Sequence, residues 1–394
     1  MLSTQPASAG RDQRELPLQL GLGGSLTGVR GYSHTETGTA YERARALCEA
    51  VNDPEHLGLA LTGLAIFFST RGEVQHGREL AARVLAVADE KGDSELAVWG
   101  HLYVAVAEHN QGKLASSVAH CQLARASYDA DRHPTGWFVV LGDPGIGARC
   151  YEAWNLWLLG YPDRALIGAR EAVLCARQLD HPFTLAFALF FQAATHWYRR
   201  ETLQQQELAQ QVMALGEAQG FPLWFGVGRA FWAAGQVAAG HAEAISEIGE
   251  GLRVAGETGS QSGAPALMLL LAEAQQATRH VADAQTTVAV ARALAQQTGQ
   301  PFVDAEVHRL DGDLLLATGG GAAAARYHRA LAIAREQGTC SFELRAATSL
   351  ARLLREQGRP AEARELLAPI YGWFTEGFDT GDLVEAKALL EQLT

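Results

Sequence analysis

The chain has 394 residues, of which 48% are hydrophobic, and its 32 Lys and Arg against 44 Asp and Glu give a net charge of −12. A negative charge of this size repels polyanions and excludes nucleic acid as a default partner. No run of about 18 uncharged apolar residues occurs in the sequence, so we expect no helical membrane span and no membrane contact.

Residues 1–12 carry mostly small and polar side chains, and we expect them to be disordered or flexible. They lack the basic flank, apolar core and small-residue cleavage site of a secretory signal, which predicts a cytoplasmic protein. Residues 13–394 are expected to form one continuous array, because a single repeat period runs through them.

Glycine, or a residue that can replace it, recurs at a nearly constant spacing. The first series marks the turn inside each repeat and consists of Gly31, Gly72, Gly112, Gly160, Arg200, Gly240, His280, Gly319 and Gly358. The second series ends the helix after each turn and consists of Asn52, Gly92, Arg132, Asp180, Gly220, Gly259, Gly299, Gly338 and Gly377. Both series advance in steps of 39 to 41 residues, with one step of 48 residues in each. Most of these residue types tolerate the left-handed backbone that closes a helix, so the spacing predicts helix-turn-helix repeats with a period of about 40.

Apolar residues recur at intervals of three and four between the turns. One helical face is formed in this way by Leu344, Ala347, Leu350, Ala351 and Leu354. Alanines such as Ala165 and Ala363 lie where two helices joined by a short turn must approach closely. The predicted fold is therefore all-α, a right-handed superhelical solenoid of about nine tetratricopeptide-like repeats with a C-terminal capping helix inside residues 379–393.

The longer step falls at residues 129–147, where two prolines and four glycines predict an irregular loop. Within it, the apolar run 137–141 followed by GDPGIGAR resembles a strand that leads into a phosphate-binding loop. Ala148 and Arg149 stand where that motif needs Lys and then Ser or Thr to hold phosphate and magnesium. We interpret the segment as structural and predict no nucleotide cofactor.

Three segments carry a resemblance to a known family: residues 151–191, residues 217–231 and residues 343–393. They resemble the C-terminal tetratricopeptide region of large bacterial signalling proteins that join a class III adenylate or guanylate cyclase domain to an ATPase of the STAND type. The resemblance extends from about Arg14 to Leu393. It implies a sensor or interaction arm, with a cyclase or ATPase module as a possible partner, because catalysis in such proteins belongs to the other domains.

The sequence offers no support for catalysis or for a metal site. The cysteines Cys48, Cys121, Cys150, Cys175 and Cys340 form no CxxC pair, which predicts reduced and mostly buried thiols. Neither an HExxH motif nor an Asp-rich calcium loop nor a Gly-x-Ser-x-Gly elbow is present. We expect His181 to start a helix and His196 to pack or to face the groove. The chain is therefore predicted to be no enzyme and to hold neither metal nor cofactor.

The first helix of each repeat should line a concave groove, and counting back from the turn residue predicts its exposed positions. The resulting candidates for partner binding are Trp154, Trp157, Trp197, Glu306, Arg309, Asp313, Arg345, Arg352 and Arg355. Aromatic and Arg side chains often carry binding energy, which favours a protein or peptide ligand with an acidic part. The alternative is that the tryptophans fill space between helices and that the arginines are solvated on an outer face.

Three functions remain open from the sequence. The first is a protein-protein interaction scaffold or regulatory arm of a bacterial signalling system, which binds a partner segment in its groove. The second is a sensor that encloses a small-molecule or peptide inducer. A divergent nucleotide hydrolase built on residues 142–149 is the third and least favoured. Self-association through exposed repeat ends is also possible.

Overall fold

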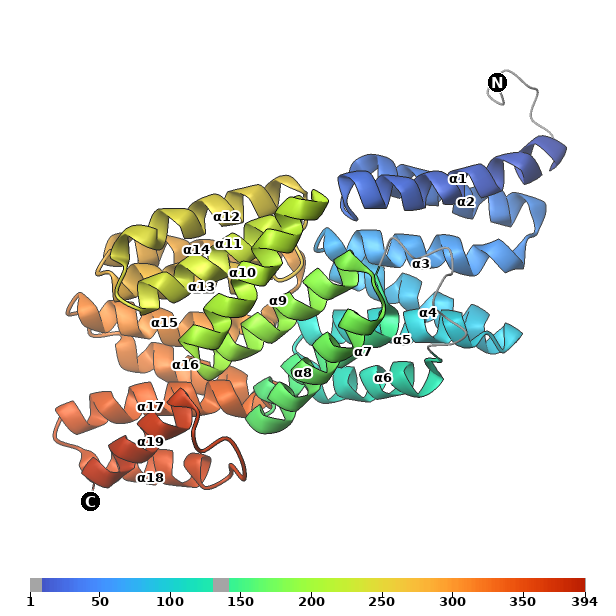
Figure 1. Cartoon of the computed structure of the whole chain (residues 1–394). Helices are drawn as coiled ribbons and strands as arrows, with labels where there is room; N and C mark the ends of the chain where they lie inside the picture. The colour runs from blue at the N-terminus through green and yellow to red at the C-terminus, as the bar shows by residue number, and fades with distance from the viewer. Residues whose placement is uncertain (1–8, 130–141, 394) are drawn as a thin grey trace.

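The computed structural model describes residues 9–129 and 142–393, and these residues form nineteen α-helices and no strand. The first nine bounds are α1 (Ala9–Arg30), α2 (Thr35–Val51), α3 (Pro54–Thr70), α4 (Val74–Lys91), α5 (Ser94–Asn110), α6 (Leu114–Ser127), α7 (Pro144–Leu158), α8 (Pro162–Gln178) and α9 (Pro182–Arg199). The remainder are α10 (Thr202–Gln219), α11 (Pro222–Ala238), α12 (Ile245–Glu257), α13 (Ala264–Ala277), α14 (Val281–Thr298), α15 (Asp304–Ala317), α16 (Ala323–Gln337), α17 (Cys340–Glu356), α18 (Pro360–Tyr371) and α19 (Gly381–Gln392). Figure 1 shows them stacked one after another as antiparallel pairs, from the blue N-terminus to the red C-terminus. Nine pairs followed by α19 confirm the predicted all-α solenoid with its capping helix.

The turn residues adopt the backbone that the spacing predicts. Every glycine of both series has a positive φ, and so do the non-glycine members Asn52, Asp180 and Arg200. One assignment was wrong: the left-handed residue between α13 and α14 is Arg279, with φ of 64°, and His280 follows it. The step from Gly240 to this turn is therefore 39 residues and not 40. Arg132 lies outside the described residues.

Small side chains lie where neighbouring helices approach closely, as the sequence predicts. Ala165, Ala351 and Ala363 are completely buried between neighbouring helices. The predicted face of α17 is buried as well, and in α19 the residues Leu383 and Ala386 face the last pair. A solenoid of this kind has a continuous core, since each pair covers the apolar face of the one before it.

Two predicted boundaries were wrong. Residues 9–12 belong to α1, which is anchored on α2 by the buried Leu16 and Leu20. The loop predicted for residues 129–147 ends earlier, because α7 begins at Pro144, and residues 130–141, including the whole apolar run, lie outside the described residues. Asp143 caps α7 through its carboxylate, and Pro144 fits the first helical turn because that position has no backbone N–H bond to lose.

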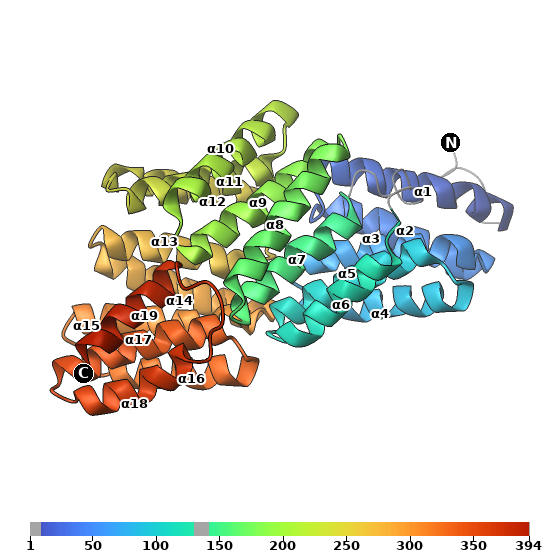
Figure 2. The same ribbon diagram turned by 60° about the horizontal axis from the view of Figure 1, so that its bottom comes forward.

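The superhelix is wound so tightly that pairs five units apart touch. The backbone N–H of Gln261 donates to the carbonyl oxygen of Thr70 at 2.8 Å, and the Ser341 hydroxyl donates to the carbonyl of Trp157. Further along, the N–H of Gly377 donates to Asp163 at 2.9 Å. Figures 1 and 2 show the result: α17 lies against α7, and the segment between α18 and α19 lies beside the start of α8. We call this set of contacts the inter-turn interface. Among the described helices, none is long and apolar enough to cross a membrane.

Candidate binding groove

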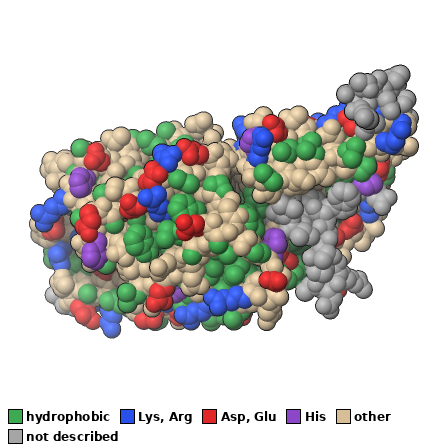
Figure 3. Space-filling view, turned by 45° about the horizontal axis from the view of Figure 1, so that its top comes forward, with side chains coloured by type: hydrophobic (Ala, Val, Ile, Leu, Met, Phe, Trp, Pro, Cys, Tyr) green, Lys and Arg blue, Asp and Glu red, His purple; other side chains and the backbone are tan. Residues whose placement is uncertain are grey.

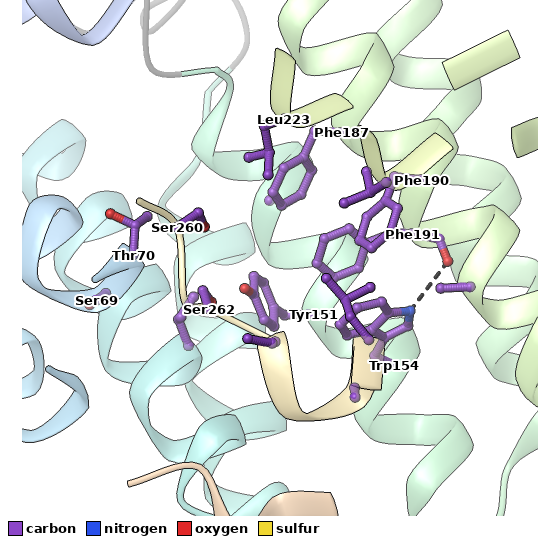
Figure 4. A pocket seen from close by; sticks show the side chains of 18 of the residues that line it. Ser69, Thr70, Tyr151, Trp154, Phe187, Phe190, Phe191, Leu223, Ser260 and Ser262 are labelled. Atoms are coloured by element: carbon purple, nitrogen blue, oxygen red, sulfur yellow. Dashed lines mark hydrogen bonds between the residues drawn. The ribbon is translucent and has the colours of Figure 1, made fainter. Parts of the chain in front are cut away.

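Aromatic side chains line a pocket on the inner face of the superhelix. It has a volume of about 240 Å³ and is bounded mainly by α5, α7, α9, α11 and α13. Its aromatic lining consists of Tyr32, Trp99, Tyr103, Tyr151, Trp154, Phe183, Phe187, Phe190, Phe191, Trp197, Tyr198, Trp224, Phe231 and Phe302. Figure 3 shows hydrophobic side chains gathered along the hollow in the middle of one face, and Figure 4 shows the rings of the pocket opposite Ser69, Thr70, Ser260 and Ser262. We call this cavity the aromatic pocket.

The rings of the aromatic pocket hold one another in place. Trp154 of α7 stacks on Phe191 of α9 with ring centres 4.0 Å apart, and its indole N–H donates to the carbonyl of Phe191 at 3.3 Å (Figure 4). Phe187 stacks on the other side of Phe191, with centres 4.5 Å apart. Such stacked contacts stabilise beyond area burial, so the wall is preorganised.

A buried hydrogen-bond chain sets the protonation of His109 at the edge of this pocket. The Ser117 hydroxyl donates to the carbonyl of Ala105, and it accepts from the side-chain amide of Asn155 at 2.8 Å. The amide oxygen of Asn155 is thereby turned to His109 Nδ1, 2.7 Å away, which must donate to it. Burial lowers the pKa of His109 to about 4, so the ring is neutral at pH 7. His109 Nε2 is consequently a hydrogen-bond acceptor.

Four polar atoms of residues that line the aromatic pocket are buried and have no hydrogen-bond partner within the described residues. They are Ser69 Oγ, His109 Nε2, Asn110 Nδ2 and Trp224 Nε1. A buried polar group that stays unbonded costs about 1–3 kcal/mol. The pocket is therefore better matched to a ligand with some polar groups than to a purely apolar one.

Charged side chains line a second cavity, of about 370 Å³, which adjoins the aromatic pocket. Its ionisable residues are Arg200, Glu273, Arg309, Asp313, Arg345, Arg352, Asp382 and Glu385. Trp197 of α9 lines both cavities, and its indole N–H donates to Glu273 of α13 at 3.2 Å. We call this second cavity the charged pocket. An apolar and a charged compartment thus lie on either side of a single half-buried indole ring.

The arginines of the charged pocket are already paired inside the protein. Arg309 donates to both carboxylate oxygens of Glu306 and also pairs with Asp313. Arg345 is buried and donates to Asp382 at 2.7 Å and to Glu306 at 3.3 Å. These pairs neutralise the guanidinium groups, which argues against the expectation that they attract an acidic segment.

The nine predicted groove residues are brought together only in part. Trp154 and Trp197 line the aromatic pocket, while Trp197, Arg309, Asp313, Arg345 and Arg352 line the charged pocket. The remaining three line neither: Trp157 is buried against Tyr198, Glu306 is buried beneath Arg309, and Arg355 bonds Gln392 of α19 near the surface.

The residue six positions before the turn lines a pocket in most repeats, and this regularity predicts one residue that the sequence reasoning missed. Trp154, Asp313 and Arg352 hold this position before Gly160, Gly319 and Gly358, and all three line a pocket. Counted from the observed turn residue Arg279, the same position is Glu273. The sequence-based candidates come from other repeats, and the same count from the predicted turn residue His280 gives Ala274, because one residue rotates a helical position by about 100°.

The segment that resembles a phosphate-binding loop has a different role. The Asp143 carboxylate accepts the N–H of Ile146 at 2.8 Å, so the start of α7 already holds a negative group of the chain itself. A Cβ at Gly145 would lie 2.7 Å from the ring of Tyr128, so this glycine allows close packing. The described residues therefore show no phosphate cradle at this position.

The other candidate reactive groups are structural in the part of the chain that the structure describes. His181 caps α9 by accepting the N–H of Thr184, and His196 is buried against Glu201, as expected of a helix-start and a packing residue. Burial raises the pKa of Cys48 and Cys340 to about 11, which keeps these thiols protonated. No group of three or more His, Cys, Asp or Glu in residues 9–129 and 142–393 could hold a metal ion.

None of the protein-family models matches the sequence, and neither does any of the curated proteins. Among solved structures, a Rap protein complexed with competence and sporulation factor is 12% identical, with a TM-score of 0.50 over 84% of this chain and 99% of that one. The APC/C hetero-tetramer Cut9–Hcn1 is 14% identical, with a TM-score of 0.52 over 98% and 67% of the two chains. A STAND protein with a tetratricopeptide repeat sensor from Pyrococcus horikoshii is 12% identical over 93% and 56%, but its TM-score of 0.40 carries no argument. At these identities the likeness concerns the fold alone: the chain has the fold of tetratricopeptide-like helical-repeat proteins.

Proposed function

We propose that the chain is a cytoplasmic, non-catalytic interaction module that binds a short segment of a protein partner in its concave groove. The observation that carries this proposal is the junction of the aromatic pocket and the charged pocket at Trp197. An extended peptide places neighbouring side chains about 3.3 Å apart along its axis, so it can reach both compartments at once.

The volume of the aromatic pocket supports a side chain or a short segment as its occupant. Pockets for drug-sized ligands span about 300–1,000 Å³, and the aromatic pocket, at about 240 Å³, falls below that range. Its preformed rings would bury one bulky apolar side chain, and such anchors dominate the affinity of protein interfaces.

A second candidate function is favoured by the buried polar atoms without partners around the same pocket. A small apolar molecule with a few polar groups could satisfy them, which would make the chain the sensor for an inducer. The resemblance to the repeat regions of cyclase-ATPase regulators fits either function, with a cyclase or ATPase module as the effector.

The test is selection of random peptides on the whole chain, followed by calorimetric measurement of the affinity of the best peptide. Ala266, which is only partly buried, lines the aromatic pocket, so Ala266→Phe should fill the cavity and abolish binding without emptying the core. Phe378→Ala changes an exposed ring that lines neither pocket and serves as the control. Binding that survives Ala266→Phe would refute the proposed site. A metabolite that raises the melting temperature when no peptide binds would favour the sensor.

A further inference from the structure

Among the described residues, one carboxylate of the charged pocket is paired less closely than the others. Every other carboxylate near it has close cationic or hydroxyl partners: Asp313 with Arg309 and Tyr327, Asp382 with Arg200 and Arg345, Glu385 with Arg200 and Arg352, and Glu306 with Arg309 and Arg345. Glu273 accepts only the indole N–H of Trp197, and its nearest guanidinium nitrogen, on Arg309, is 4.0 Å away.

The charge balance of this region points to the same residue. Four guanidinium groups line the pocket, and five carboxylates lie on it or directly behind it when the buried Glu306 is included. The single excess negative charge belongs to Glu273, because each of the other four carboxylates is paired. Burial and the neighbouring Glu306 carboxylate raise the pKa of Glu273, and the more distant charges of Arg345, Arg309 and Arg200 offset this only in part.

Glu273 lies where it can contact a peptide side chain next to an apolar side chain that occupies the aromatic pocket. Its Oε2 atom lies 3.2 Å from the Trp197 nitrogen, and the same indole ring forms part of the wall of the aromatic pocket. Consecutive Cα atoms of a peptide are about 3.8 Å apart, so residues one or two positions apart can straddle one indole ring.

We propose that Glu273 is the specificity residue of the groove and selects a peptide segment in which Lys or Arg stands one or two positions from a bulky apolar residue. The basic side chain pairs with Glu273 in the charged pocket while the apolar side chain enters the aromatic pocket. This inference rests on the proposed function, which it narrows from any short segment to a basic-apolar one. The net charge of −12 also favours the approach of such a segment.

The test uses a library of N-acetylated random heptapeptides tethered by their C-termini, so that the only cations are side chains. Selections are run on the wild-type chain, on Glu273→Gln and on Glu243→Gln, whose carboxylate is exposed outside both pockets. Gln retains an oxygen that accepts the Trp197 N–H, so Glu273→Gln removes the charge and keeps the local hydrogen bond. Unchanged melting temperatures of both variants show that they are folded.

The wild-type chain and Glu243→Gln are expected to enrich apolar residues next to Lys or Arg, whereas Glu273→Gln enriches the apolar residue alone. Calorimetry on the best peptide should show that replacing its Lys by norleucine weakens binding to the wild type about tenfold or more, and to Glu273→Gln less than twofold.

Two negative results are distinguishable. If peptides bind through an apolar residue with no basic preference, the role of Glu273 is refuted and the peptide-binding function stands. If the wild type enriches no peptide at all, both proposals fail. A selection on Glu273→Lys adds an independent arm, because it should enrich Asp or Glu at the position where the wild type enriches Lys or Arg.

Discussion

Replacing Arg345 by Met should destabilise the protein far more than replacing an arginine near the surface of the same helix. The guanidinium is buried, bonds Asp382 and Glu306, and donates to the carbonyl of Tyr198 at 2.8 Å. It also lies 5.0 Å from the ring centre of Trp157. Met retains most of the volume, so the main loss is that of the charge opposite two buried carboxylates. Removing one partner of a buried ion pair costs about 3–5 kcal/mol, and we expect a loss in that range.

The measurement is urea unfolding followed by circular dichroism, compared with Arg355→Met on the same helix. Arg355 bonds only Gln392 near the surface, so its replacement should change the free energy of unfolding by less than about 0.5 kcal/mol. In the double variant Arg345→Met with Asp382→Asn, the charge of residue 382, which Arg345→Met leaves paired with Arg200 alone, is removed as well, and we expect a recovery of about 0.5–3 kcal/mol. Equal effects of Arg345→Met and Arg355→Met would refute the assignment of Arg345 as a buried structural cation.

Three further perturbations test other parts of the structure. The pKa of His109 is about 4 in the folded protein and about 6.5 in the unfolded chain. The contribution of His109 to the free energy of unfolding is therefore complete above pH 6.5 and falls by up to about 3 kcal/mol as the pH drops to 4. His109→Gln should flatten this part of the stability profile measured by urea unfolding, and a profile parallel to the wild type would contradict the burial argument. Gly160→Ala introduces a Cβ 2.5 Å from Trp373 at a φ of 93°, so the melting temperature should fall by several degrees, corresponding to about 1–3 kcal/mol; an unchanged value would show that the inter-turn interface yields freely. Asp143→Ala removes the cap of α7 and one acceptor of the Tyr128 hydroxyl, which should cost about 1–2 kcal/mol in urea unfolding, and a neutral result would argue against the cap.

The fold could be predicted from the sequence because its determinants are local. Residues with a left-handed backbone follow the helices at regular intervals, and glycine at positions such as Gly72 or Gly299 marks these positions in the sequence. The prediction failed by one residue at Arg279, where no glycine marks the turn and the spacing alone had to decide. The start of α7 was also missed, since two glycines in its first turn suggested a loop. They are tolerated there because Asp143 caps the helix and neighbouring side chains leave no space for a Cβ.

The candidate site was less accessible to sequence reasoning because it depends on distant pairs. The aromatic character at Trp154 and Trp197 was evident, but the neutralisation of Arg345 depends on Asp382, in another helix, and on the carbonyl of Tyr198, 147 positions earlier. Which residues meet across turns is set by the pitch of the superhelix. That pitch is the sum of many small packing angles, and no local pattern encodes it.

The inter-turn interface also limits how this array can change in length. Solenoids whose units touch only their neighbours can gain or lose a unit with little effect on the rest. Here, duplication of the pair α11–α12 would displace Ser341 from Trp157 and Gly377 from Asp163 by a whole unit. Every hydrogen bond across the turns would then face the wrong partner. The inter-turn interface therefore constrains the number of repeats. Insertions that the fold tolerates are confined to loops away from that interface.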